Sequence, residues 1–109
     1  MEAEAANILK VCEGKIEPYK MKPNEILLNE YGDFIPNKFN MPRGGIIILD
    51  NQMKFTEGVV LIFLDQKSGY SFNSGMIPRD TSQEIQINQT GNYTVFSDVL
   101  DGKVDLLVS

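Results

Sequence analysis

The sequence predicts an all-β protein, a single antiparallel β-sandwich of seven to eight short strands. Six apolar residues follow one another at 59–64, entered by Gly58 and closed by Asp65. A run this short between turn residues is typical of a strand covered on both faces. Residues 83–87 alternate strictly between polar and apolar, which directs one set inward and the other into water. Turn residues separate such segments at even spacing, the pattern of a sandwich or barrel.

The remaining strands are expected where short apolar runs lie between turn residues, at 25–29, 46–49, 70–72, 92–97 and 103–108. Residues 1–13 are expected to form an arm or a short helix, because alanines and two early glutamates favour a helix. Residues 8–11 are the alternative, a first strand. Residues 76–80 are expected to be an irregular crossover. A chain of 109 residues, 1–109, is expected to be one domain with a single core.

The run at 59–64 raises the question of what covers its second face. One of two alternating sets fills the core: Val59, Leu61 and Phe63, or Val60, Ile62 and Leu64. A two-sheet sandwich covers only one face of each sheet. The other set is therefore expected to be covered by the loops of the first half, or to contact a partner.

The pair Asp101-Gly102 predicts the register of the last hairpin. Asp-Gly is preferred in a two-residue type I′ turn, which would set Val95 opposite Val108 and Asp98 opposite Asp105. The same register places five apolar residues on one face, which is expected to be a core face: Val95, Val99, Val104, Leu106 and Val108. Like charges that face each other across a ladder cost up to about 1 kcal/mol, which Lys103 lying diagonally, solvent or a bound cation would offset. The favoured interpretation is a solvated acidic turn. The alternative is a calcium site with Asp98, Asp101 and Asp105 as oxygen ligands; no other cofactor is expected.

Composition excludes several classes of function. The chain has no histidine and a single cysteine, Cys12, which removes Ser-His and Cys-His catalysis, histidine metal sites and an internal disulfide. Its net charge is −5 and its basic residues do not cluster, so no nucleic-acid partner is expected. No apolar run approaches the roughly 20 residues that a membrane-spanning helix needs. We therefore expect a protein that is not an enzyme and has no membrane span.

Aromatic residues in the loop-rich first half are the candidate binding residues. They are Tyr19, Tyr31, Phe34 and Phe39, which lie near prolines. Aromatic side chains on loops are common anchors for a protein or glycan partner. The alternative is that they are lids that close the ends of the sandwich over its core.

Residues 90–95, Thr-Gly-Asn-Tyr-Thr-Val, resemble the tyrosine-corner region of immunoglobulin-like and related sandwiches. There, a tyrosine two residues after a glycine sets its hydroxyl against the backbone of the preceding corner. With residues 58–65 and 102–108, the later half resembles immunoglobulin-like and jelly-roll accessory domains of bacterial envelope and secreted proteins. The cysteine pair and core tryptophan of antibody domains are absent from the sequence. The resemblance implies a domain that binds, spaces or docks and does not catalyse.

Two functions are compatible with these observations. The first is a non-catalytic, extracytoplasmic binding or structural module that contacts a protein, a glycan or a neighbouring domain. The alternative is a small intracellular partner-binding protein, such as an inhibitor or a self-assembling subunit. The acidic start differs from a signal peptide, so the expected location is extracytoplasmic or cell-surface if a leader was removed and cytoplasmic otherwise.

Overall fold

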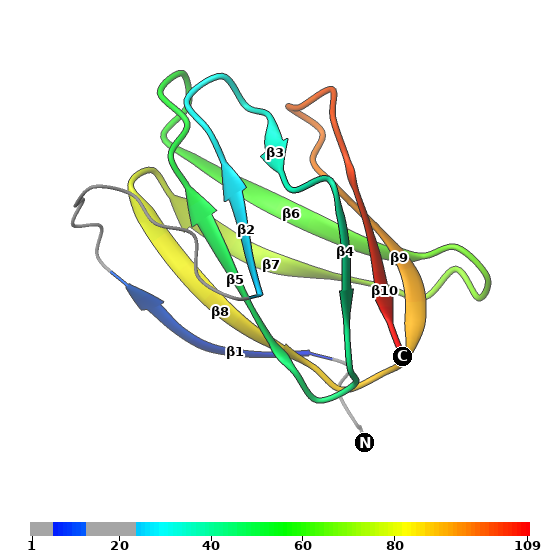
Figure 1. Ribbon diagram of the computed structural model, residues 1–109. Coiled ribbons are helices and arrows are strands. Elements are labelled where there is room, and N and C mark those ends of the chain that lie inside the picture. The colour runs from blue at the N-terminus through cyan, green and yellow to red at the C-terminus, as the bar shows by residue number, and fades with distance from the viewer. Residues whose placement is uncertain (1–5, 13–23) are drawn as a thin grey trace.

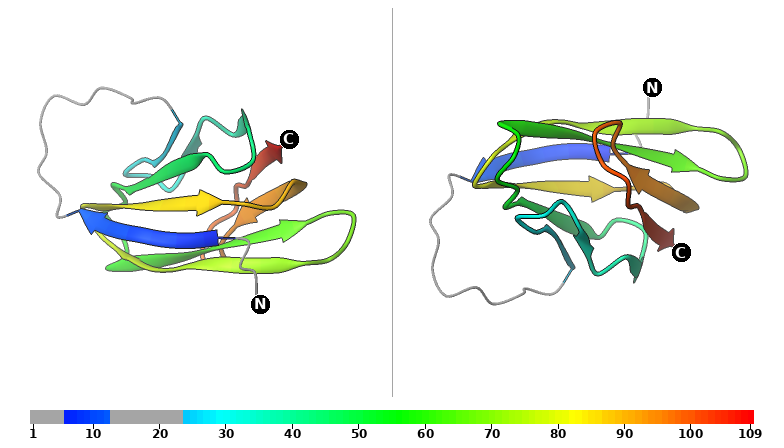
Figure 2. Two further views of the ribbon diagram at one scale, coloured as in Figure 1. Left: turned by 90° about the horizontal axis from the view of Figure 1, so that it is seen from below. Right: turned by 90° about the horizontal axis from the view of Figure 1, so that it is seen from above.

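The computed structural model describes residues 6–12 and 24–109, with side chains described for 24–109, and these residues form ten strands (Figure 1). The strands are β1 (Ala6–Cys12), β2 (Glu25–Leu28), β3 (Phe34–Ile35), β4 (Lys38–Met41), β5 (Ile46–Asn51), β6 (Gly58–Asp65), β7 (Ser71–Pro78), β8 (Thr81–Ile87), β9 (Gly91–Phe96) and β10 (Val104–Val108). They form two stacked layers, visible from below and above in Figure 2. The predicted all-β sandwich is therefore confirmed.

Each layer is a five-stranded sheet. The first sheet has the order β1-β8-β5-β2-β3 and the second has the order β4-β10-β9-β6-β7. Two neighbouring pairs, β2–β5 and β4–β10, are parallel. The structure differs from the expected antiparallel sandwich of seven to eight strands in its strand number and in these two parallel pairs, because β3 and β4 follow each other in the chain but belong to different sheets. A local turn pattern does not reveal such a crossing.

The first strand replaces the expected N-terminal helix. Residues 6–12 form β1, which pairs antiparallel with β8 along the edge of the first sheet. The prediction of an arm or short helix over residues 1–13 is wrong for this part, and the alternative strand is correct. Pairing with β8 outweighs the helix propensity of the alanines, because propensity is a weak preference that tertiary contacts override.

Strand β6, which lies between β9 and the edge strand β7, buries one of its two faces in the core. Val59, Leu61 and Phe63 point into the core with at most 2% exposure, whereas Val60, Ile62 and Leu64 lie on the outer side and are half-buried. Its neighbour β7 continues through residues 76–78, which were expected to be irregular. A register shift between Val60 and Ile62 accommodates this longer pairing.

The last hairpin has a different register from the predicted one. Val95 pairs with Val104, so the strands are joined by residues 97–103 and the two-residue Asp101-Gly102 turn does not form. The pairing is displaced by four residues, an even number, and the alternation of side chains between faces is therefore kept. Val95, Val104, Leu106 and Val108 remain in the core as predicted. Val99, predicted to join them, is 60% exposed.

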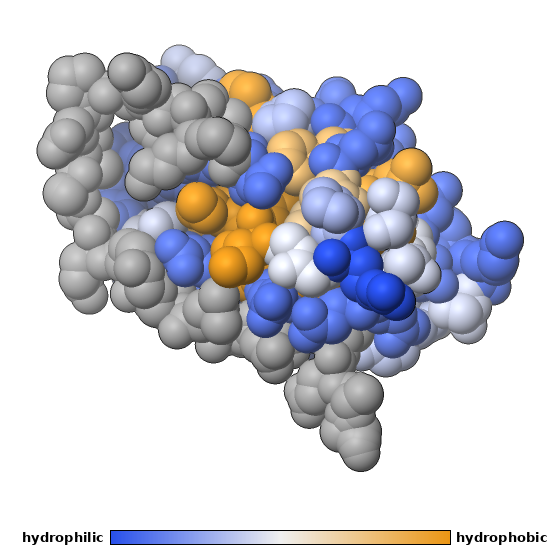
Figure 3. All heavy atoms as spheres, turned by 60° about the horizontal axis from the view of Figure 1, so that its bottom comes forward, coloured by the Kyte–Doolittle hydropathy of each residue, from blue (hydrophilic) through white to orange (hydrophobic). Residues whose placement is uncertain are grey.

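The outer side of the first sheet carries some exposed apolar residues. Apolar side chains gather near the middle of the face shown in Figure 3. On this side Ile35 and Ile46 are exposed, and Leu27 and Ile48 are half-buried. Within the described residues, no helix is long and apolar enough to span a membrane.

Candidate docking surface

Three loops meet at one end of the sandwich, drawn uppermost in Figure 1. They are residues 29–33 between β2 and β3, 52–57 between β5 and β6, and 97–103 between β9 and β10. Gly32 lies where they touch: a Cβ atom there would be 3.0 Å from Cζ of Phe55 and 3.1 Å from Cδ2 of Leu100. Gly32 also has a φ of +86°, which disfavours other residues. A glycine thus allows the three loops to pack closely.

Hydrogen bonds from Asn29 fix the first loop. Its side-chain Oδ1 accepts from the backbone N–H groups of Tyr31, at 2.9 Å, and Asp33, at 3.0 Å. An asparagine that bonds to the backbone a few residues ahead is a standard way to hold a turn. The position of Tyr31 at the end of the molecule is therefore set by the short segment around it.

The second loop is anchored from inside the protein. Buried Asn51 accepts a bond from the N–H of Met53 at 3.0 Å and donates to the carbonyl of Ile77 at 2.9 Å. Met53 has 0% exposure and fixes the start of the loop in the core. Arg79 donates from its backbone N–H to the carbonyl of Glu57 at 2.7 Å. These contacts hold both sides of Phe55.

Each of the three loops carries an exposed apolar side chain at this end of the sandwich (Figure 1). Tyr31 is 74% exposed, Phe55 57% and Val99 60%, and Leu100 packs beneath them against the core. We call these four residues the end-loop surface. Exposed aromatic side chains on loops that a rigid scaffold holds are the usual anchors of a binding site.

Acidic residues dominate the three loops around the end-loop surface. Five acidic residues, Glu30, Asp33, Glu57, Asp98 and Asp101, stand against two basic ones, Lys54 and Lys103, which gives a net charge of −3. A side-chain hydrogen bond to Glu30, reinforced by the charge of its carboxylate, raises the pKa of Tyr31 above its ordinary value.

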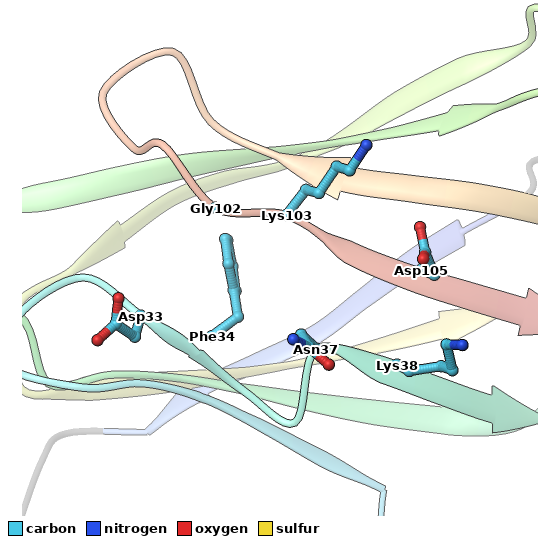
Figure 4. Close-up of a pocket in the computed structure, with 7 residues that line it drawn as sticks. All are labelled: Asp33, Phe34, Asn37, Lys38, Gly102, Lys103 and Asp105. Carbon is cyan, nitrogen blue, oxygen red and sulfur yellow. The ribbon is translucent and has the colours of Figure 1, made fainter.

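A hollow of about 660 Å³ lies beside the end-loop surface. It is lined by Asp33, Phe34, Asn37, Lys38, Gly102, Lys103 and Asp105, which Figure 4 shows along β3, β4 and the start of β10. The ring of Phe34 is directed toward Gly102 and is only 7% exposed. The hollow therefore offers polar side chains but little open aromatic surface.

The four aromatic residues expected to bind a partner lie in different environments. Tyr31 belongs to the end-loop surface, Phe34 closes the floor of the hollow, and Phe39 packs half-buried against the core. Tyr19 lies outside the described residues. Phe55 and Val99 were not among the expected binding residues. The sequence signal for Phe55 was present, an aromatic residue between turn residues, but the two-residue turn placed Val99 in the core.

The three aspartates considered for calcium are spread along the last hairpin. Asp98 and Asp101 are exposed in the loop 97–103, and Asp105 lies in β10 opposite Thr94 on one side and Lys38 on the other. Asp98 and Asp105 therefore do not face each other. Within the described part of the chain, no three His, Cys, Asp or Glu residues are grouped so as to hold a metal ion.

The opposite end of the sandwich is built around Asp65 and Tyr93. The hydroxyl of Tyr93 donates to the carbonyl of Gln89 at 3.0 Å, which is the contact expected of a tyrosine corner. Asp65 accepts from the Ser68 hydroxyl at 2.6 Å and from the N–H of Asn92 at 3.2 Å. The bond from Ser68 lowers the pKa of Asp65, although burial acts in the other direction. Burial, followed by the charge of Asp65, raises the pKa of Tyr93 to about 12.

Amicyanins are among the solved structures that have a similar fold. The chain resembles an oxidised amicyanin mutant and a reduced Cu(I) form of another, each with a TM-score of 0.70 and 9% identity, over 97% of this chain and 100% of that chain. A further oxidised mutant gives a TM-score of 0.68 at 12% identity over the same shares. No family model matches the sequence, and no curated protein matches it. The fold is therefore a cupredoxin-like β-sandwich, and the expected immunoglobulin-like or jelly-roll relationship is not supported.

These neighbours correct the expectation about cofactors. The sequence predicts no cofactor, with calcium as the alternative. The structures that share this fold contradict that expectation, because they include Cu(I) forms and so indicate copper as the cofactor to consider. A blue-copper site is built from two histidines and a cysteine. The chain has no histidine and only Cys12 as a thiol, so its residues do not fit such a site. The likeness to amicyanins therefore extends to the fold and not to a copper site of that kind.

Proposed function

We propose that this chain is a non-catalytic module that docks another protein through the end-loop surface. The partner's contact face carries basic side chains around apolar ones. The observation that supports this proposal is the convergence of Tyr31, Phe55 and Val99, each more than half exposed, at one end of the molecule. Aromatic residues that are exposed together, within an acidic surrounding, fit the apolar centre and polar rim of a protein interface.

The loops are suited to docking because they are held before any partner arrives. Asn29 fixes the first loop and Asn51 the second. In the third loop, the Ser97 hydroxyl accepts from the N–H of Val99 at 3.3 Å. A surface that is already ordered loses less conformational entropy on binding. The side chains that reach the partner are therefore presented on fixed backbone.

The chemistry of the surface favours a basic protein over other ligands. A net charge of −3 repels nucleic acid and also a second copy of the same surface. The neighbouring hollow does not favour a sugar ring, which would stack on an open aromatic face, because Phe34 there is only 7% exposed. Opposite charges across the interface would speed association and select the partner. The extracytoplasmic location stays a prediction, which fractionation of cells producing the full gene product would check.

Affinity capture followed by titration tests the proposal. The immobilised chain is used to capture proteins from its source, and each recovered protein is purified and titrated against variants. Replacing Tyr31, Phe55 and Val99 together by serine is expected to weaken binding by at least about tenfold, because anchors of this kind carry most of the binding energy. The matched control replaces Ile35, Ile46 and Tyr70 by serine, three exposed apolar residues elsewhere. Equal binding by both triple variants would overturn the proposal.

A further inference from the structure

The outer side of the second sheet carries a continuous apolar stripe. Val60, Ile62 and Leu64 of β6, Phe96 of β9 and Met76 of β7 form this outer stripe, which the register of the strands brings together. Ile62 lies opposite Phe96, and Val60 lies opposite Met76. Met76 is 60% exposed and the other four are half-buried. Gly58 leaves room for Met76, whose Sδ would be 2.6 Å from a Cβ atom there.

The same side of the sheet is nearly free of charge. Among its outward positions on the five strands, only Lys38 and Asp105 are charged, and they lie directly opposite each other on β4 and β10. This side therefore has no net charge in a chain of net charge −5. Two such surfaces can meet without like-charge repulsion, since each brings one charge of each sign. The end-loop surface, with its five neighbouring acids, lacks this property.

The area of the outer side of the second sheet limits how tightly two copies can bind through it. Four inter-strand spacings of about 4.8 Å and strands about 20 Å long give a flat area of roughly 400 Å². A standard stable interface buries about 800 Å² per partner. Contact across this side alone is therefore expected to be weak and to depend on concentration.

We propose that the outer stripe is a two-fold interface between two copies of this chain. Face-to-face packing of the two second sheets would cover the second face of β6, about 10 Å from its counterpart in the other copy. The end-loop surface lies at the ends of the strands and stays open in such a dimer. A dimer then presents two docking surfaces, which strengthens attachment to a partner that offers two sites. The inference goes beyond the proposed docking function and does not depend on it.

Sedimentation velocity of the purified chain tests the proposal. The wild-type chain is expected to pass from monomer to dimer with a dissociation constant on the order of 10–1,000 μM. Met76→Glu is expected to weaken association by at least about tenfold, because it buries an unpaired charge. Val99→Glu is the matched control, since Val99 has the same 60% exposure and receives the same charge. It is expected to leave the dimer unchanged.

Exchanging the charges of Asp105 and Lys38 gives a second, independent test of the dimer interface. Asp105→Lys leaves each copy with two positive charges on this side and is expected to weaken the dimer. Adding Lys38→Glu restores one charge of each sign and is expected to restore association. The proposal is wrong if the wild-type chain stays monomeric up to about 1 mM, or if Val99→Glu acts like Met76→Glu. A monomeric wild-type chain would leave the docking proposal standing, whereas a dimer weakened equally by Val99→Glu would mean that the copies associate through the end-loop surface; the two results therefore identify which proposal fails.

Discussion

The two ends of this sandwich use aromatic residues in opposite ways. At the end with the end-loop surface, Tyr31 is 74% exposed and the three loops have a net charge of −3. At the other end, Tyr93 is 1% exposed, and the loops 42–45, 66–70 and 88–90 contain two basic residues and no acidic one. The first end exposes Tyr31 and Phe55 to water, whereas the second uses the buried ring of Tyr93 to close the core and has one partly exposed ring, Tyr70 at 36%.

The difference in exposure between Tyr93 and Tyr31 distinguishes a residue that stabilises the fold from a residue that is available for binding. Tyr93 packs edge-on against Phe72 with ring centroids 5.6 Å apart, and its hydroxyl is bonded to Gln89. Buried contacts of this kind contribute to stability. The ring of Tyr31 is 74% exposed and is not packed in the core, so it contributes little to the stability of the fold. Exposed apolar residues that do not stabilise a fold are the ones to examine for binding.

Truncation of the two tyrosines is expected to produce the largest contrast. Tyr93→Ala removes a fully buried ring and is expected to lower the free energy of unfolding by about 3–5 kcal/mol. Tyr93→Phe removes only the bond to Gln89 and is expected to cost about 1 kcal/mol. Tyr31→Ala is expected to change stability by no more than about 0.5 kcal/mol. Urea unfolding of the three variants measures this, and a large loss for Tyr31→Ala would mean that the end-loop surface is part of the fold's support.

Two glycines with similar backbones allow a closer comparison of the ends. Gly32 and Gly69 have φ values of +86° and +80°, so alanine is strained at either, at a cost of about 1–2 kcal/mol. A Cβ atom at Gly69 meets nothing within 4 Å, whereas at Gly32 it meets Phe55 and Leu100. Gly32→Ala is therefore expected to cost more than Gly69→Ala, and to weaken partner binding as well. Equal losses in thermal or urea unfolding would show that the three loops are not tightly packed at Gly32.

The sequence predicts the fold where the determining signal is local. Alternation along 83–87 and the short run at 59–64 are sufficient to identify strands, because a strand repeats every two residues. The alternation also identifies the inward residues of β9 and β10, even though the register was wrong. A displacement of four residues leaves every side chain on its own face.

The remaining features depend on contacts between distant segments. Asp101-Gly102 is a strong local signal for a tight turn, yet Leu100 is held near Gly32 and Phe55, and a Cβ atom at Gly102 would lie 3.6 Å from Cδ2 of Phe34. Because the loop 97–103 replaces the two-residue turn, Val99 lies in the loop and is 60% exposed. The parallel pairs β2–β5 and β4–β10 likewise have no local signature. The sequence does not predict the candidate docking surface, since Tyr31 is its only residue among the expected binding residues.

The smallest expected effect concerns the acid stability of the end that contains Asp65. The pKa of Asp65 is lowered in the folded protein, so its contribution to stability is complete above its ordinary pKa of 3.8 and is lost as pH falls through the folded value. Asp65→Asn is expected to flatten the decline of stability below about pH 4. Ser68→Ala keeps the carboxylate but removes its main hydrogen bond, and should produce part of the same change. Urea unfolding between about pH 2 and pH 7 measures both variants. An acid limb identical to that of the wild-type chain in Asp65→Asn would show that this carboxylate does not fasten β6 to β9, and would leave the buried ring of Tyr93 as the main support of that end.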